Sequence, residues 1–258
     1  MTTFTSYLDV LPDPNYPIGD AGQSLATASG GTAGPGFASV SLTSDQPRIK
    51  DSTNSGRILT RSVAAHKWKI KITYNPMTRE QFDPVYTFLL QRNALRNNYF
   101  YISLPQNRVP KDSTFATWSA SNVLKTVSSE TVGTQLMTIQ GDSTQGNANY
   151  YNSTTHNTPL PGDMFTFNAA NSNHKKAYMV TRVGTSSTYN TSGGGMAPTG
   201  THQLQIHCIP TLQKSLSAAD TLVFTNPLLK VMMSGDIQEY SLNTQNLYSF
   251  SLNLIEVQ

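Results

Sequence analysis

The chain has 258 residues, enough to bury a core without disulfides or a structural metal. Charged residues make up 13% of it, about half the usual share, and the formal net charge is +3. A single cysteine excludes a disulfide scaffold. We expect no signal peptide, because the N-terminus has neither a charged nor an apolar region of the required kind. We also expect no membrane span, because no apolar run approaches ~20 residues.

The low charge is balanced by many hydroxyl and amide side chains, a composition typical of all-β proteins that contact other proteins. The charges are also unevenly distributed. Before Arg48 there is no basic residue, whereas from Arg48 to Arg108 there are eleven against three acidic ones. This asymmetry predicts electrostatic matching to a partner or a neighbouring copy, and a nucleic-acid-binding patch is the rival interpretation.

Residues 1–36 are predicted to form a flexible N-terminal arm. Four prolines break regular structure there, and residues 21–36 are rich in Gly, Ala, Ser and Thr. A disordered tail and an arm that a partner orders are both compatible with this composition.

Strands are predicted from residue 37 onward, first at 37–42, 48–50 and 58–60. The clearest one covers 65–74, where large apolar residues alternate with Lys67, Lys69 and Lys71. This period of two predicts a half-buried strand with the lysines in a row on the outer face, about 7 Å apart. The row is interpreted either as a contact surface or as a solvated face that protects against aggregation.

A helix is predicted at about residues 78–96. Thr78 and Gln81 form a capping-box pattern, although Pro84 predicts either a kink or a later start, with Asp83 as the cap. An apolar stripe follows at helical spacing, and Arg92 and Arg96 near the end suit the helix dipole. A strand at 99–104 closes this part.

Beyond Pro110, short predicted strands alternate with long polar loops. The last one, 247–257, resembles the 65–74 strand in length and alternation, and the two are predicted to pair. The fold class is therefore mainly β: a β-sandwich or barrel with one flanking helix, plus an inserted small barrel-like domain. The predicted division is an arm at 1–36, a discontinuous domain at 37–110 and 227–258, and an inserted domain at 111–226.

The other strands predicted beyond Pro110 lie at 116–119, 123–127, 136–140, 164–168, 177–183, 203–209, 221–224, 228–233 and 239–242.

No arrangement of residues indicates chemistry. The five histidines are scattered, no paired carboxylates are nominated, and neither G-x-S-x-G nor a phosphate-binding loop occurs. Cys208 lies in an apolar run beside His207, whose side chain would point to the opposite face of a strand, so Cys208 is interpreted as a buried hydrophobe. The sequence predicts no catalytic, cofactor-binding or metal-binding residues.

The order of several segments resembles tail proteins of tailed bacteriophages. A Gly-Arg segment precedes a Trp-bearing strand, a Pro-Met-Thr-Arg helix start and a Phe-rich strand that ends in Pro. The segments that carry the resemblance are 55–61, 66–68, 76–79, 100–105, 160–167, 177–181, 209–212, 224–227 and 248–256.

This resemblance implies a ring-forming distal tail, baseplate-hub or tube-adaptor protein that links the tail tube to the baseplate. Its partners would be copies of itself, tube and baseplate proteins and, transiently, DNA in a central channel. It would be made in the host cytoplasm and reside in the virion tail. Lys67, Lys69, Lys71, Arg92 and Arg96 are the candidate interface residues.

Two other functions compete with this one. A nucleic-acid-binding module would explain the basic segment, and a carbohydrate- or receptor-binding module of a virion would explain the polar insertion. An enzyme is the interpretation that the sequence favours least.

Overall fold

The computed structural model describes residues 10–16, 32–62, 65–94, 98–168, 174, 176–184, 201–235 and 239–257. These residues form two compact units. Unit 1 comprises Met1–Ile102 and Lys230–Val257, and unit 2 comprises Ser103–Leu229. The predicted fold class is confirmed, since one unit is a sheet with a flanking helix and the other is a small closed barrel.

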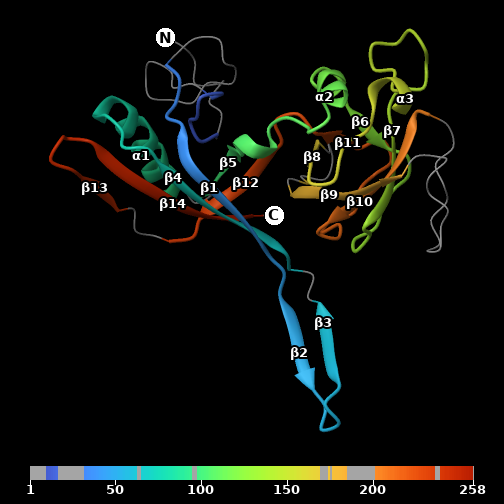
Figure 1. Ribbon diagram of the computed structural model, residues 1–258, viewed down its shortest axis with the longest axis horizontal. Coiled ribbons are helices and arrows are strands. Elements are labelled where there is room, and N and C mark those ends of the chain that lie inside the picture. The colour runs from blue at the N-terminus through green and yellow to red at the C-terminus, as the bar shows by residue number, and fades with distance from the viewer. Residues whose placement is uncertain are drawn as a thin grey trace. The chain divides into compact units, whose positions relative to one another are not determined.

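The sheet of unit 1 is built around two central strands. Its order is β1 (Phe37–Asp45), β4 (Lys67–Tyr74), β14 (Tyr248–Glu256), β12 (Leu228–Met233) and β5 (Tyr99–Ser103), and β13 (Tyr240–Leu242) also pairs with β14. The predicted pairing of the strands at 65–74 and 247–257 is confirmed, because β4 and β14 are antiparallel neighbours in a register that sets Leu252 opposite Ile72. Strands distant in sequence thus lie side by side in one layer (Figure 1).

Strict alternation along β4 and β14 gives this sheet two different faces. Trp68, Ile70, Ile72 and Tyr74 are buried, while the lysines between them are exposed. In β14 the buried residues include Phe250, Leu252 and Leu254, separated by exposed polar ones. Because neighbouring strands are in register, the buried apolar side chains of the two strands fall on one face.

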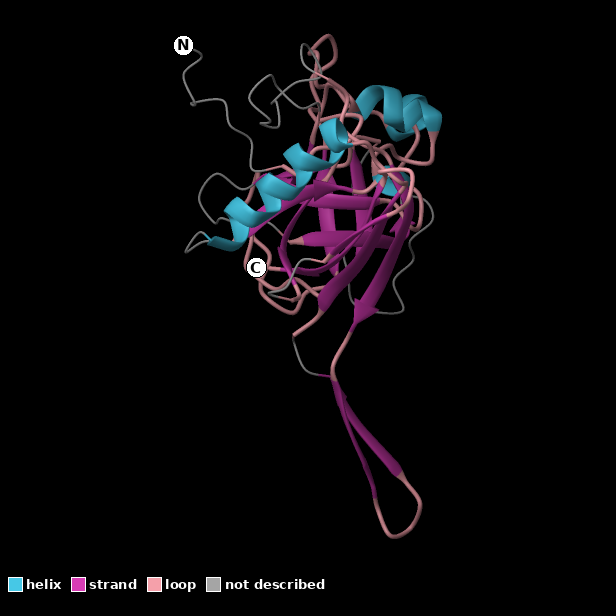
Figure 2. Ribbon diagram, turned by 90° about the vertical axis from the view of Figure 1, so that its left-hand side faces the viewer, coloured by secondary structure: helices cyan, strands magenta, loops and turns pink. Residues whose placement is uncertain are grey.

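The predicted helix is confirmed at Arg79–Ala94 (α1), and it packs on the sheet (Figure 2). Phe82 stacks on Tyr248 with 4.4 Å between ring centroids, and Phe88 meets Phe100 edge-on at 5.6 Å. Pro84 lies inside the helix, so the helix does not begin at Pro84. The sequence predicts an apolar stripe of Phe82, Val85, Tyr86, Leu89 and Leu90. This stripe is partly corrected, because Phe88 is also buried and Leu90 is 43% exposed.

Part of the predicted flexible arm packs on unit 1. Val10 bridges Tyr101 in parallel fashion, and Val10 and Leu11 are each 1% exposed. Gly34 lies so close to the backbone of Asp13 that a Cβ there would come within 2.6 Å of its nitrogen. Residues 1–9 and 17–31 of the arm lie outside the described residues.

Unit 2 is a closed barrel of six strands in the order β10–β7–β6–β11–β8–β9. Their bounds are β6 Leu124–Thr126, β7 Leu136–Gln140, β8 Met164–Asn168, β9 Ala177–Gly184, β10 Gln203–Ile209 and β11 Thr221–Val223. The barrel encloses an aromatic core that contains Phe115, Phe165 and Tyr178. A 3-10 turn, η2 (Pro105–Asn107), precedes it.

The strand predicted at 116–119 is wrong, because these residues belong to helix α2 (Ser113–Ser119). The Asp112 carboxylate caps this helix by accepting from the Phe115 backbone N–H at 2.7 Å. Phe115, Trp118 and Ser119 then face the core at helical spacing. The β-branched and aromatic composition favoured a strand, whereas the cap and the i, i+3, i+4 burial favour a helix.

Cys208 is buried on β10, as predicted. Burial raises the pKa of its thiol to about 12, so the reactive thiolate is suppressed at neutral pH.

The core of unit 1 yields a stability prediction. Replacing Phe250, which contacts Phe82, by Ala should lower the free energy of unfolding by about 3–5 kcal/mol, because it leaves a cavity. Chemical denaturation followed by Trp68 fluorescence measures this loss. The exposed neighbour Ser251→Ala should change it by no more than about 0.5 kcal/mol. Equal losses for the two variants would contradict the assignment of faces.

A buried histidine yields a pH prediction for unit 2. His174 hydrogen-bonds the Tyr178 hydroxyl at 2.7 Å, and burial lowers its pKa to about 4. The folded state therefore keeps it neutral while the unfolded chain, with a pKa of about 6.5, takes up a proton.

Unfolding free energy should thus fall as pH drops from about 6.5 to about 4, by at most about 1.4 kcal/mol per pH unit from this group. Urea unfolding of the full chain at several pH values, followed by Trp118 fluorescence, measures the slope. His174→Gln should flatten it. A slope that survives His174→Gln would show that another group is responsible.

Candidate interaction surfaces

The lysine row predicted from the sequence lies on the outer face of the unit 1 sheet. Lys67, Lys69 and Lys71 are all exposed on β4. The Lys69 ammonium forms an ion pair with Asp45 on β1 at 2.7 Å, and this contact lowers the pKa of the Asp45 carboxyl. Lys67 stands opposite the same aspartate in the strand register. One carboxylate thus faces two of the three cations.

Lys71 is flanked by uncharged polar groups. Ser41 lies beside it on β1 and Asn253 on β14. A depression of about 340 Å³ lies beside it, and Lys69, Thr43 and Ile255 share its walls. The face is therefore rich in hydroxyl groups and has a net positive charge, which suits an acidic partner.

Arg92 and Arg96 differ from the lysines. Arg92 is 6% exposed, and its guanidinium lies over the Phe88 ring at 5.3 Å, so its position in unit 1 is internal. Arg96 lies outside the described residues. The structure therefore groups the three lysines on one surface and does not bring Arg92 to it.

A further surface was not identified from the sequence as a functional feature. Strands β2 (Arg48–Ser52) and β3 (Ile58–Ser62) form a separate two-stranded sheet that extends away from the main sheet of unit 1 (Figures 1 and 2). The tip is closed by a Thr53–Arg57 hydrogen bond and by Gly56 in the left-handed region. We call this element the hairpin.

The hairpin is exposed wherever its burial is described. Ile49 is 60% exposed, Ile58 70% and Leu59 47%, values unusual for side chains of this size. Four basic residues against one aspartate make it cationic. The sequence signal was available, since two short strands flank a Thr-Asn-Ser-Gly turn, but the missing burial partner is visible only in the fold.

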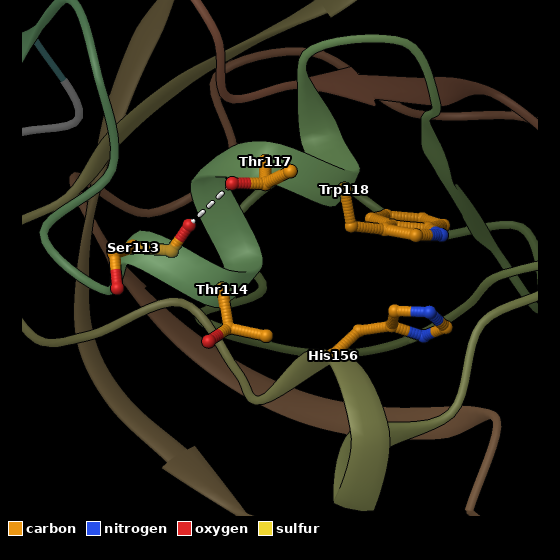
Figure 3. Close-up of a pocket in the computed structure, with 5 residues that line it drawn as sticks. All are labelled: Ser113, Thr114, Thr117, Trp118 and His156. Carbon is orange, nitrogen blue, oxygen red and sulfur yellow. Dashed lines mark hydrogen bonds between the residues drawn. The ribbon is translucent and has the colours of Figure 1, made fainter.

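Unit 2 carries a different surface feature, a shallow pocket of about 450 Å³ (Figure 3). Ser113, Thr114, Thr117 and Trp118 of α2 line it, together with His156 of the short helix α3 (Ser153–His156). The Trp118 and His156 rings lie 5.9 Å apart, and Tyr151 contacts both. None of the described residues that line the pocket is acidic or carries a permanent positive charge.

Neither a metal-binding cluster nor a membrane-crossing helix is found within the described ranges. No three His, Cys, Asp or Glu residues there converge on one point. No helix in the same ranges is long and apolar enough to cross a membrane.

Comparison with known proteins points to one family. Residues 27–107 match the family described as the N-terminal part of the A domain of distal tail protein pb9. This range contains β1 to β5, α1 and the hairpin. The distal tail protein pb9 of Escherichia phage T5 is 26% identical to this chain over 231 residues, covering 86% of this chain and 93% of that protein. The resemblance to phage tail proteins is thereby confirmed: this chain is similar to bacteriophage distal tail proteins, over residues 27–107 by the family match and over most of its length by the T5 protein.

Proposed function

We propose that this protein forms a ring at the distal end of the tail, where it acts as a hub or adaptor between the tail tube and the baseplate. Its role is structural and not catalytic. Its partners are copies of itself, tube and baseplate proteins and, in transit, DNA. It is made in the host cytoplasm and functions in the virion tail.

The hairpin is the observation that carries the proposal of self-association. A two-stranded hairpin is marginally stable in water, and no further strand from the described part of the chain pairs with either of its outer edges. Burying Ile49, Ile58 and Leu59 against another chain would stabilise it by about 1.5–3 kcal/mol for each side chain that becomes fully buried. A partner surface would therefore remove the unfavourable exposure of these apolar side chains to water.

A ring requires heterologous contacts, in which one surface of each copy meets a different surface of the next. The hairpin is such a surface, because it is cationic, apolar at intervals and distinct from the rest of unit 1. The lysine row offers a second, chemically different surface on the same unit. Two unlike surfaces on one unit are what a closed head-to-tail ring uses.

The hairpin can be tested by substitution. Ile58→Asp combined with Leu59→Asp should convert rings to monomers without lowering the thermal midpoint, because both side chains already contact water in the isolated chain. Light scattering after size-exclusion chromatography gives the mass, and negative-stain microscopy shows whether rings with a central hole are present.

Val132→Asp is the matched control, since Val132 is a similarly exposed apolar residue, 57% exposed, in unit 2. It should leave assembly unchanged. Rings that form normally in the double variant would remove the hairpin from the interface.

The lysine row has its own test. Changing Lys67, Lys69 and Lys71 together to Glu should weaken ring assembly if the row meets an acidic neighbour, whereas changing them to Gln should weaken it less. The competing nucleic-acid function predicts salt-dependent DNA binding by the wild type that both triple variants lose. Sedimentation and DNA retention at two salt concentrations separate the outcomes. Normal rings in the Glu variant would exclude the row from the ring contact.

A further inference from the structure

The pocket on unit 2 has no role in ring formation as proposed above. We propose that it is a binding site for a neutral sugar residue. The inference rests on the chemistry and the rigidity of the five residues that line the pocket, so it stands or falls independently of ring formation.

The pocket combines hydroxyl, methyl and ring surfaces without a charge (Figure 3). Ser113, Thr114 and Thr117 are exposed and lie on one side of α2. The Thr117 hydroxyl donates to the Ser113 carbonyl at 2.9 Å, which leaves its two lone pairs and its methyl group for a ligand. The pocket volume, about 450 Å³, lies in the range of small-ligand sites.

The orientation of the His156 ring is fixed by a hydrogen bond to one of its nitrogens. Its Nδ1 accepts a hydrogen bond from the Asn152 backbone N–H at 3.1 Å. In the neutral ring the proton must therefore reside on Nε2, which becomes a hydrogen-bond donor. A sugar hydroxyl is a suitable acceptor for this group.

Two aromatic residues support that imidazole. The Trp118 indole is only 7% exposed, and its Nε1 donates to the Tyr150 carbonyl at 3.0 Å. Trp118 thus closes the floor of the pocket and offers a ligand little stacking area of its own. Tyr151 stacks on the His156 ring with an interplanar angle of 28°. The partly exposed imidazole is the ring that a sugar would contact.

The two sides of the pocket are tied together. The Asn157 side-chain amide, immediately after α3, donates to the Asp112 carboxylate at 3.0 Å, and the same carboxylate caps α2. The Tyr151 hydroxyl donates to the Asn157 carbonyl. These bonds hold the lining residues in place before a ligand arrives, which reduces the ordering cost of binding.

The composition of the lining selects among ligand classes. An anion or a cation would find no opposite permanent charge among the lining residues. A purely apolar ligand would leave the Thr114 hydroxyl and the His156 Nε2 proton unsatisfied, which is costly. A neutral pyranose matches both features, because its C–H face packs against the ring and methyl groups while its hydroxyls exchange hydrogen bonds.

The test uses the full chain and neutral sugar probes: D-glucose, D-galactose, D-mannose, N-acetyl-D-glucosamine and their common disaccharides. Titration is followed by calorimetry and by the fluorescence of Trp118 in a Trp68→Phe variant, which removes the other tryptophan. We expect saturable binding of at least one probe with a Kd on the order of 1 mM.

Substitutions assign the binding to the pocket. Thr114→Val keeps the methyl group and replaces the hydroxyl by a second methyl, so it should weaken binding about fivefold. His156→Ala should weaken it about tenfold or more. Thr155→Val is the matched control, because Thr155 is exposed on α3 but does not line the pocket, and it should leave binding unchanged.

Two results would overturn the proposal. The first is no saturable response to any probe up to about 50 mM, where even weak sites with a Kd of a few millimolar fill. The second is equal affinity in the wild type, Thr114→Val and His156→Ala. Calorimetry of the wild type decides the question if the Trp68→Phe variant does not fold.

Discussion

The central position of β4 is the constraint on which unit 1 depends. This strand pairs on one side with β1 and on the other with β14, so its alternation sets which face of three strands is apolar. A shift of one residue would turn Ile70 and Ile72 outward and bury lysines, which is strongly unfavourable. Because the register is fixed, α1 has one apolar face on which to pack, and the opposite face presents lysines.

The two units carry different kinds of surface. Unit 1 has extended surfaces of the kind that proteins use to assemble, whereas unit 2 has a barrel with a well-packed aromatic core and a small polar pocket. Contacts between proteins depend on area and charge, while recognition of a small molecule depends on a few fixed groups. Under the two proposals, assembly and ligand recognition would depend on different units, so a substitution could change one property without disturbing the other.

Much of the fold could be predicted because local patterns agree with the tertiary structure. The strand at 136–140 and the one at 203–209 have the predicted bounds, since alternation and turn residues act locally. The pattern failed at 116–119, where a cap at Asp112 outweighs β propensity. The exposure of the lysine row followed from alternation, but the burial of Arg92 did not, because it depends on a ring one turn earlier in the helix. The pocket could not be predicted from the sequence, since His156 and Trp118 are far apart in the chain and meet only in the folded structure.

The hairpin also has a mechanical consequence. Its two strands are continuous in sequence with β1 and β4, so a partner that grips the tip pulls on the two strands that build the main sheet. A force along this ribbon would pull β1 and β4 in the same direction, so it would load in shear the hydrogen bonds that join β4 to β14. Hydrogen bonds loaded in shear must break together, so a hairpin anchored in this way would resist pulling better than one whose bonds open one at a time.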